Sequence, residues 1–304
     1  MKLSRVYIFE STLAVLLGWV SIASIALFLQ LGHAVEYALV ALLAVVVLKR
    51  HLIDAYSQYF LTILVSVGAI ATILPTMGVD YAYILRNISP LLTASVMTIY
   101  ISFLSICLAC VMSFVAALAK LSNRPVLCGI ADVYISFFRG TPLLLQVFIV
   151  YLGLPQVGIV LTAIPAGVLA LGLNYGAYMA EIVRAGIQGV PGGQSEASLS
   201  LGLTRPQTFF LVVAPQALRL ILPPISNQFI AMLKDSSLVS FLGVWELMFV
   251  ARTAGRTDFR QFEMLIGAAL IYWLMSFCFE MAQRRLEKKL SQSRERTTAV
   301  MAGN

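Results

Sequence analysis

Charged residues are scarce in this chain. Asp, Glu, Lys and Arg make up 12% of its 304 residues, about half the share found in an ordinary soluble domain, whereas apolar residues make up 60%. This composition excludes a soluble domain of the usual kind and predicts a membrane protein. The net charge of +7 does not indicate nucleic-acid binding, because the basic residues stand between and beyond the apolar runs.

Catalytic and metal-binding patterns are also missing. Cys107 and Cys110 stand in an apolar run without polar company, so we interpret them as small buried hydrophobic side chains. His33 and His51 lie in predicted loops with no second histidine at ligand spacing. No H-E-x-x-H, G-x-S-x-G or G-x-x-x-x-G-K-[ST] pattern occurs. We therefore expect no catalytic residue, no metal site and no cofactor bound by this chain itself.

Long apolar runs are abundant, and crossing the hydrocarbon core takes about 20 such residues. The first run lacks a small-residue cleavage site, so we expect a retained span and not a signal peptide. The uncharged stretch 140–180 is too long for one crossing, and "GLPQVG" at 153–158 divides it into two antiparallel spans. The sequence thus predicts an all-α polytopic membrane protein with eight spans: 11–29, 35–48, 55–74, 91–119, 131–152, 160–180, 216–242 and 262–282.

The basic residues predict the orientation of these spans. With a cytosolic N-terminus, fifteen Lys and Arg lie inside and four lie outside, so both termini and the loop 185–215 are predicted to be cytosolic. Arg252, Arg256 and Arg260 lie on the outer side against this rule, although acidic residues stand nearby.

The predicted cytosolic loop contains the polar stretch "GQSEASLSLGLTRPQTFFLVVAP" at 193–215. Residues 191–193 are Pro-Gly-Gly and should end the preceding helix. Ser195 is a plausible N-cap for a short helix over 195–201, with Glu196 in the first turn, where the helix dipole favours a carboxylate. Gly202 fits a left-handed C-terminal cap. Thr204 fits the cap of a second helix, with Pro206 and Gln207 in its first turn.

This element has too few apolar residues to form its own core, so Ala197, Leu199 and Leu203 should contact something else. The spacing alone is compatible with an amphipathic loop on the bilayer surface or with a docking site for another protein. A DNA-reading helix-turn-helix is disfavoured, because "SEASLSLG" offers no basic face.

The residues "EAS", Gly202, Val212 and "VAP" at 213–215 resemble the motif of permease subunits in ATP-binding-cassette (ABC) importers. In that family Glu-Ala-Ala is followed by a glycine, a nine-residue gap, a branched aliphatic residue and a proline. Ser198 and Ala214 depart from the pattern, but both are small. The resemblance implies that a cytosolic ATPase receives this loop through Ser195, Glu196, Ala197, Ser198, Gly202, Thr204 and Pro215.

Four further stretches are similar to the polar amino-acid uptake branch of the same family. They are "FFRGTPLLLQ" at 137–146, "YMAEIVRAGIQGVPGGQ" at 178–194, "PQALRLILPPISNQFIAMLKDSSLVS" at 215–240 and "GVWEL" at 243–247. The resemblance implies a type I ABC importer transmembrane domain with a five-helix core at 81–290. About three extra N-terminal spans would lie in 1–80, and a cytosolic tail would follow at 291–304.

The resemblance also implies a function, namely the permease subunit of an ATP-driven importer of polar or charged amino acids in the bacterial cytoplasmic (inner) membrane. The partners it implies are cytosolic ABC ATPase subunits that hold ATP and Mg, a second permease subunit and an extracytoplasmic solute-binding protein. The alternative is a secondary amino-acid transporter driven by an ion gradient, which also uses interrupted helices at the midplane. No pair of matching interrupted segments in two halves supports that alternative.

Charged residues inside a span cost about 2.5 to 3.5 kcal/mol on insertion scales, so those in 216–242 need a reason. Pro223 and Pro224 predict a broken helix there, which is tolerated where it lines a cavity. Either Lys234 pairs with a neighbouring carboxylate to fix packing, or the polar set lines the translocation path. That set consists of Asn227, Lys234, Asp235, Ser236 and Ser237.

Other polar residues have structural interpretations. Glu181 and Arg184 can pair one helical turn apart, and Arg139 sits at a predicted cytosolic span entrance, where it marks topology or contacts the ATPase or a gate. Gly172 and Gly176 form a G-x-x-x-G step that favours close helix approach, either within the chain or between subunits.

Overall fold

The computed structural model describes residue 74, residues 78–122 and residues 124–302, with side chains described up to residue 288. The predicted spans 11–29, 35–48 and nearly all of 55–74 lie outside these residues. The chain forms two compact units, residues 1–85 and 86–304. The first contributes most of the short helix α4 (Tyr81–Arg86).

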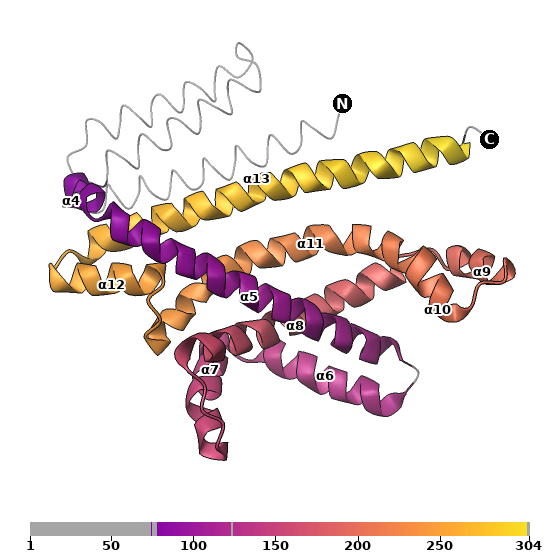
Figure 1. Cartoon of the computed structure of the whole chain (residues 1–304), viewed down its shortest axis with the longest axis horizontal. Coiled ribbons are helices and arrows are strands. Elements are labelled where there is room, and N and C mark those ends of the chain that lie inside the picture. The colour runs from indigo at the N-terminus through magenta and orange to yellow at the C-terminus, as the bar shows by residue number, and fades with distance from the viewer. Residues whose placement is uncertain (1–73, 75–77, 123, 303–304) are drawn as a thin grey trace, which may run out of the picture. The chain divides into compact units, whose positions relative to one another are not determined.

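Every regular element in the described part of the second unit is helical (Figure 1). In chain order these are α5 (Ile88–Leu121), α6 (Pro125–Gly140), α7 (Leu143–Phe148), the π-helix η1 (Ile149–Gly153), the 3-10 helix η2 (Leu154–Val157), α8 (Ala163–Gln188), α9 (Gly192–Ser200), α10 (Arg205–Thr208), the π-helix η3 (Phe209–Val213), α11 (Ala214–Asp235), the 3-10 helix η4 (Ser236–Leu242), α12 (Leu247–Thr257) and α13 (Gln261–Ala302).

Among the residues that the structure describes, four helical stretches are long and apolar enough to cross a membrane, namely 88–121, 163–188, 205–242 and 261–288. Residues 125–140 and 143–157 form a fifth span if this bent pair is counted as one. Four of the five predicted core spans are therefore found, with wider bounds at most ends. The predicted span 131–152 falls on this bent pair, whose halves meet at 110°, so it is found as one span only if the pair is counted together.

The bend has a local cause in the sequence Gly140-Thr141-Pro142. Thr141 is extended, as expected of a residue before proline, and Pro142 cannot donate a helical hydrogen bond. The side-chain amide of Gln146 donates to the freed carbonyl oxygens of Phe138 at 2.9 Å and Thr141 at 3.0 Å. The predicted turn at 153–158 is confirmed, since the η2 helix ends there at Gly158 with a φ of +83°.

The centre of the unit is the packing of α8 along α5 (Figure 1). A Cβ atom on Gly172 would lie 2.6 Å from Leu108 Cδ2, and one on Gly176 would lie 2.8 Å from Met112 Cβ. The G-x-x-x-G step therefore packs within the chain, against α5. This is the first of the two alternatives that the sequence left open, a contact within the chain or between subunits.

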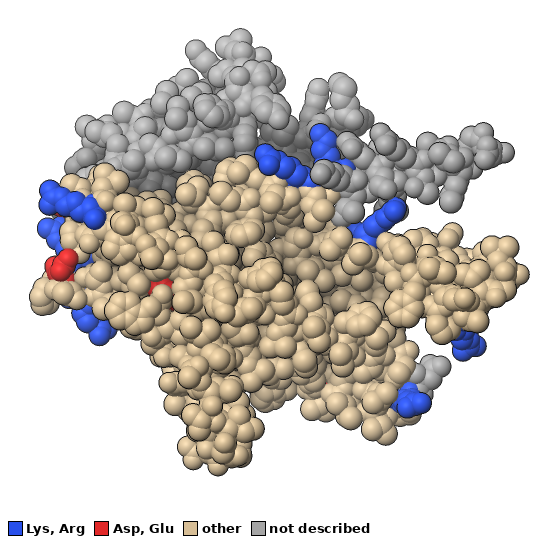
Figure 2. Space-filling model, in the orientation of Figure 1, with Lys and Arg blue, Asp and Glu red and all other residues tan. Residues whose placement is uncertain are grey.

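The two ends of this helical unit carry different short helices. Helices α9 and α10 lie at the same end as the turn between α5 and α6, and α12 lies at the opposite end (Figure 1). On the face shown in Figure 2, the surface over the middle of α5 and over α7 bears no charged side chain. Such a surface suits a hydrocarbon environment.

Candidate functional site

The loop between α8 and α11 begins with the helix α9. Its N-cap is Pro191 and it starts at Gly192, three residues before the predicted start, because Gly192 and Gly193 join the helix and do not end the preceding one. The prediction of Ser195 as N-cap is therefore wrong. Glu196 lies in the second turn and not in the first, so stabilisation by the helix dipole is weaker than expected.

The C-terminal end of α9 matches the prediction. Gly202 has a φ of +84°, a left-handed conformation that residues with a Cβ rarely adopt. Its N–H donates to the Leu199 carbonyl at 3.0 Å, and the N–H of Leu203 donates to the Ser198 carbonyl at 3.2 Å. This pair of bonds is a Schellman motif, so the predicted glycine cap is confirmed.

The second helix also starts as predicted. Thr204 is the N-cap of α10, and its backbone N–H donates to Gln207 Oε1 at 2.9 Å in a capping box. From Arg205 the chain stays helical to residue 242, so Pro215 lies inside this long span. The π-helix η3 immediately precedes α11, where Pro215 withholds one helical N–H.

One polar contact fixes α9 on α10. Ser198 is buried, and its hydroxyl donates to the Ser195 carbonyl at 2.8 Å and to Thr208 Oγ1 at 3.0 Å. This motif residue therefore packs against Thr208 within the chain. Glu196 and Ala197 are exposed, and so is Leu201, with 82% of its surface accessible.

The loop is anchored to the spans on both sides. Val190, Val213 and Ile221 belong to one buried cluster shared by α8, α11 and the loop between them. Gly186 in α8 leaves no room for a Cβ beside the Ile221 side chain. Because packed helices in such close contact shift together, a force on α9 would reach both α8 and α11.

The polar segment of α11 differs from the prediction in its backbone. Helix α11 runs without interruption through Pro223 and Pro224, so the predicted break at the prolines is wrong. The α-helical geometry instead changes to 3-10 geometry at Ser236 and ends at Gly243, whose φ is +82°.

The predicted path residues are spread over different environments. Asp235 accepts a hydrogen bond of 2.8 Å from the Tyr175 hydroxyl. Lys234 is exposed and forms no ion pair within the described part of the chain, so the predicted pair with a carboxylate is not found there. Asn227 accepts a bond of 2.9 Å from the Gln283 side chain. Ser236 is buried and Ser237 is half-buried.

The predicted pair of Glu181 and Arg184 is confirmed, with 2.7 Å between Arg184 Nη2 and Glu181 Oε2. Lys120 adds an unpredicted link, since its Nζ lies 2.9 Å from Glu181 Oε1 and 2.9 Å from Asp132 Oδ1. Lys120 and Glu181 are 61 positions apart, so no local spacing could reveal this contact.

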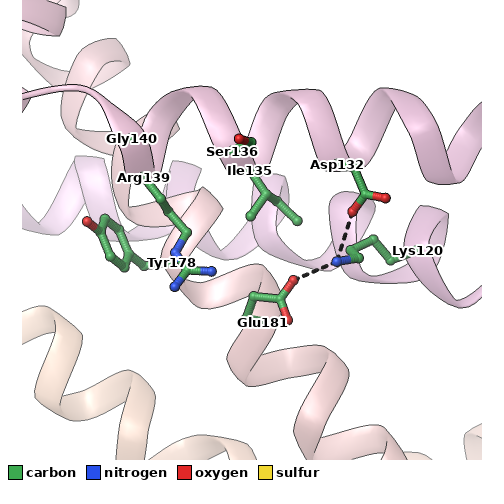
Figure 3. A pocket seen from close by; sticks show the side chains of 8 residues that line it. All are labelled: Lys120, Asp132, Ile135, Ser136, Arg139, Gly140, Tyr178 and Glu181. Carbon is green, nitrogen blue, oxygen red and sulfur yellow. Dashed lines mark hydrogen bonds and ion pairs between the residues drawn. The ribbon is translucent and has the colours of Figure 1, made fainter.

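Arg139 packs against helix α8. It lies near the far end of α6, about 21 Å from Pro125 at about 1.5 Å per residue. Its guanidinium stacks over the ring of Tyr178, 5.4 Å from the centroid. Figure 3 shows Arg139 and Tyr178 at one end of a groove between α6 and α8, and Lys120, Asp132 and Glu181 at the other.

Sequence reasoning also missed Glu246, a fully buried carboxyl at the start of α12. It accepts hydrogen bonds from the Phe249 N–H at 2.8 Å, the Tyr272 hydroxyl at 2.8 Å and the Thr98 hydroxyl at 3.3 Å. Burial raises the pKa of Glu246, and these hydrogen bonds oppose the rise. An acidic residue directly before the apolar residues 247–250 was the local signal for this N-cap.

The chain is similar in sequence to known transport proteins. Residues 109–292 match the family described as binding-protein-dependent transport system inner membrane component. The probable amino-acid ABC transporter permease protein PatM of Vibrio harveyi is 40% identical over 71% of this chain and 99% of its own length. The L-cystine transport system permease protein TcyB of Bacillus subtilis is 37% identical over 71% of this chain and 94% of its own.

A solved structure agrees with the relatives. A chain from the crystal structure of an amino acid ABC transporter with histidines is 38% identical, with a TM-score of 0.65 over 69% of this chain and 99% of that chain. The present chain therefore belongs to the family of inner membrane components of binding-protein-dependent transport systems, and it has the fold of their transmembrane subunits.

Proposed function

We propose that this chain is the permease subunit of an ATP-driven importer of polar or charged amino acids. The observation that carries the proposal is the family match over 109–292, which includes the whole α9–α10 element. The relatives named above are amino-acid or L-cystine permeases, and they support the class of solute.

In this proposal, the exposed face of α9 and the Gly202 cap contact a cytosolic ATPase that holds ATP and Mg. The exposure of Glu196, Ala197 and Leu201 supports this role, since these side chains find no cover within the described chain. The chain itself supplies no catalysis in this scheme. The close packing of α8 on α11 transmits the motion of α9 into the spans.

The proposal includes a second permease subunit, an extracytoplasmic solute-binding protein and cytosolic termini in the bacterial inner membrane. It also includes three extra spans within 1–80, which would bring the total to eight. The apolar surface over α5 and α7 in Figure 2 supports the membrane location. The solute would pass the polar end of α11, where Asp235 meets Tyr175.

The test is reconstitution in proteoliposomes with and without a co-purified ATPase. Uptake should need internal ATP at the ATPase side and should persist when sodium and proton gradients are collapsed. Uptake driven by an ion gradient without ATP would support the secondary-transporter alternative and overturn the proposal.

A further inference from the structure

The groove between α6 and α8 has a volume of about 520 Å³. Its size falls in the range of small-molecule sites in proteins. Figure 3 shows that its two ends differ in charge, with Arg139 beside Tyr178 at one end and, at the other, the carboxylates of Asp132 and Glu181 with Lys120 between them. The groove therefore offers a ligand both a cationic and an acidic contact.

The cationic end is incompletely satisfied within the chain. The Arg139 guanidinium has five N–H donors, yet among the described residues no carboxylate pairs with it, and it stacks on the face of Tyr178. Planar, paired N–H donors are suited to bidentate recognition of a carboxylate or a phosphate. This end of the groove is therefore suited to binding an anionic group of a ligand.

The acidic end has spare capacity for a cation. Asp132 makes one ion pair, with Lys120, and 59% of its side chain is accessible. An ionised carboxylate accepts at about four lone-pair sites, so Asp132 can accept from a second cation. Asp132 and Arg139 stand seven residues apart on α6, about two turns, so both project from one side of the helix.

A polar series along α8 connects this groove with the end of α11. Tyr175 binds Asp235, Tyr178 stacks under Arg139, and Glu181 and Arg184 follow at the same three-residue spacing. The series runs towards the end of α8 that leads into α9. A solute leaving Asp235 would meet the groove next along this helix.

We propose that the groove between α6 and α8 binds a zwitterionic amino acid, with Arg139 on its α-carboxylate and Asp132 on its ammonium group. The site rests on the proposed import function, and it would hold the solute between Asp235 and the cytosol.

A phospholipid headgroup is the competing ligand, since it too carries a phosphate. An anionic phospholipid headgroup offers no ammonium group to Asp132, whose side chain is 59% accessible. This carboxylate therefore favours the amino acid, and loss of phospholipid alone is an outcome of the test.

The test uses the permease–ATPase complex in nanodiscs without a binding protein, with radiolabelled L-histidine, L-arginine and L-glutamine as probes. Each probe is displaced by the same amino acid or by its methyl ester, which lacks the anionic carboxylate. Arg139→Met should weaken binding at least about tenfold and abolish the preference for the free acid over the ester. Asp132→Asn should weaken binding but keep that preference.

Two variants guard against a merely structural effect. Arg139→Lys keeps the charge but loses the bidentate geometry, so it should bind with intermediate affinity. Arg124→Met, at the exposed start of the same helix, should bind like the wild type.

The proposal is overturned if the wild-type complex binds none of the probes or if Arg139→Met keeps full affinity and ester discrimination. It is also overturned if Arg139→Met loses only co-purifying phospholipid. ATP-driven uptake by the wild type is measured in parallel. Absence of ATP-driven uptake by the wild type would refute the proposed function. Normal uptake by the wild type, together with unchanged discrimination between acid and ester in Arg139→Met, would refute only the proposed binding site in the groove.

Discussion

Replacing Gly202 by aspartate should leave the chain inserted but separate it from its ATPase. Gly202 has a φ of +84°, where an L-residue is strained by about 1 to 2 kcal/mol. A Cβ at this position meets nothing within 4 Å in the chain, so the substitution causes no internal clash. The added carboxylate would instead point out of the loop, towards the proposed ATPase surface.

The backbone strain is present in the free and in the bound permease, so it lowers the stability of the loop and does not weaken association directly. An unpaired charge forced into a protein contact costs at least about 2 kcal/mol. This cost predicts an association weakened by more than about tenfold, at about 1.4 kcal/mol per tenfold. Gly202→Asn should retain more association, since asparagine tolerates the left-handed region and adds no charge.

Gly158 provides a matched control, because its φ is +83° and its Cβ position is equally open, but it lies in the turn before α8. Gly158→Asp should therefore insert and bind the ATPase normally. The assay is the amount of ATPase retained by the purified permease at equal expression, with uptake measured beside it. Normal retention and uptake by Gly202→Asp would refute the docking role, and equal loss in both variants would attribute the effect to backbone strain.

Three further predictions concern packing and charge. Glu246→Leu strands three buried donors and should destabilise the protein by several kcal/mol at about 1 to 3 kcal/mol each, whereas Glu246→Gln should melt close to the wild type; similar melting of the two variants would contradict this. Burial raises the pKa of Glu246 from 4.5, so the folded protein holds the carboxyl proton more tightly than the unfolded chain does. The contribution of Glu246 to stability should therefore fall as the pH rises from about 4.5 through the raised pKa. Glu246→Gln should flatten that part of the profile of melting temperature against pH. Lys120→Met should lower the melting temperature and leave Glu181 reliant on Arg184, an effect that Arg124→Met, at an exposed position before α6, should not reproduce. Gly176→Ala should be destabilising by thermal melting, because its Cβ would lie 2.7 Å from the Tyr134 hydroxyl, whereas Gly192→Ala meets open space and should be neutral.

Much of this architecture could be predicted from local sequence. The long apolar runs predicted the spans of the core, and turn chemistry predicted the Gly202 cap and the Thr204 capping box, because each depends on residues a few positions apart. The start of α9 was misplaced by three residues, since two glycines that usually end a helix here begin one.

Contacts between residues far apart in the chain could not be predicted from the sequence. The bend at Gly140–Pro142 depends on Gln146 and on Asn174 from α8, whose side-chain amide donates to the Phe138 carbonyl at 3.0 Å. The Pro223–Pro224 pair predicted a break that the packed helix α11 does not show. Tertiary packing overrode local propensity at both places.

The central claim is that α9 and its Gly202 cap contact an ATPase in the cytosol. The most direct measurement places a cysteine on this surface by Leu201→Cys, in a background where Cys107, Cys110, Cys128 and Cys278 are replaced. The account predicts a cross-link from this position to the co-purified ATPase, with a yield that changes on addition of ATP, and protection from membrane-impermeant thiol reagents in intact cells. Labelling of the cysteine from outside the cell, or the absence of any cross-link while the complex transports, would contradict it.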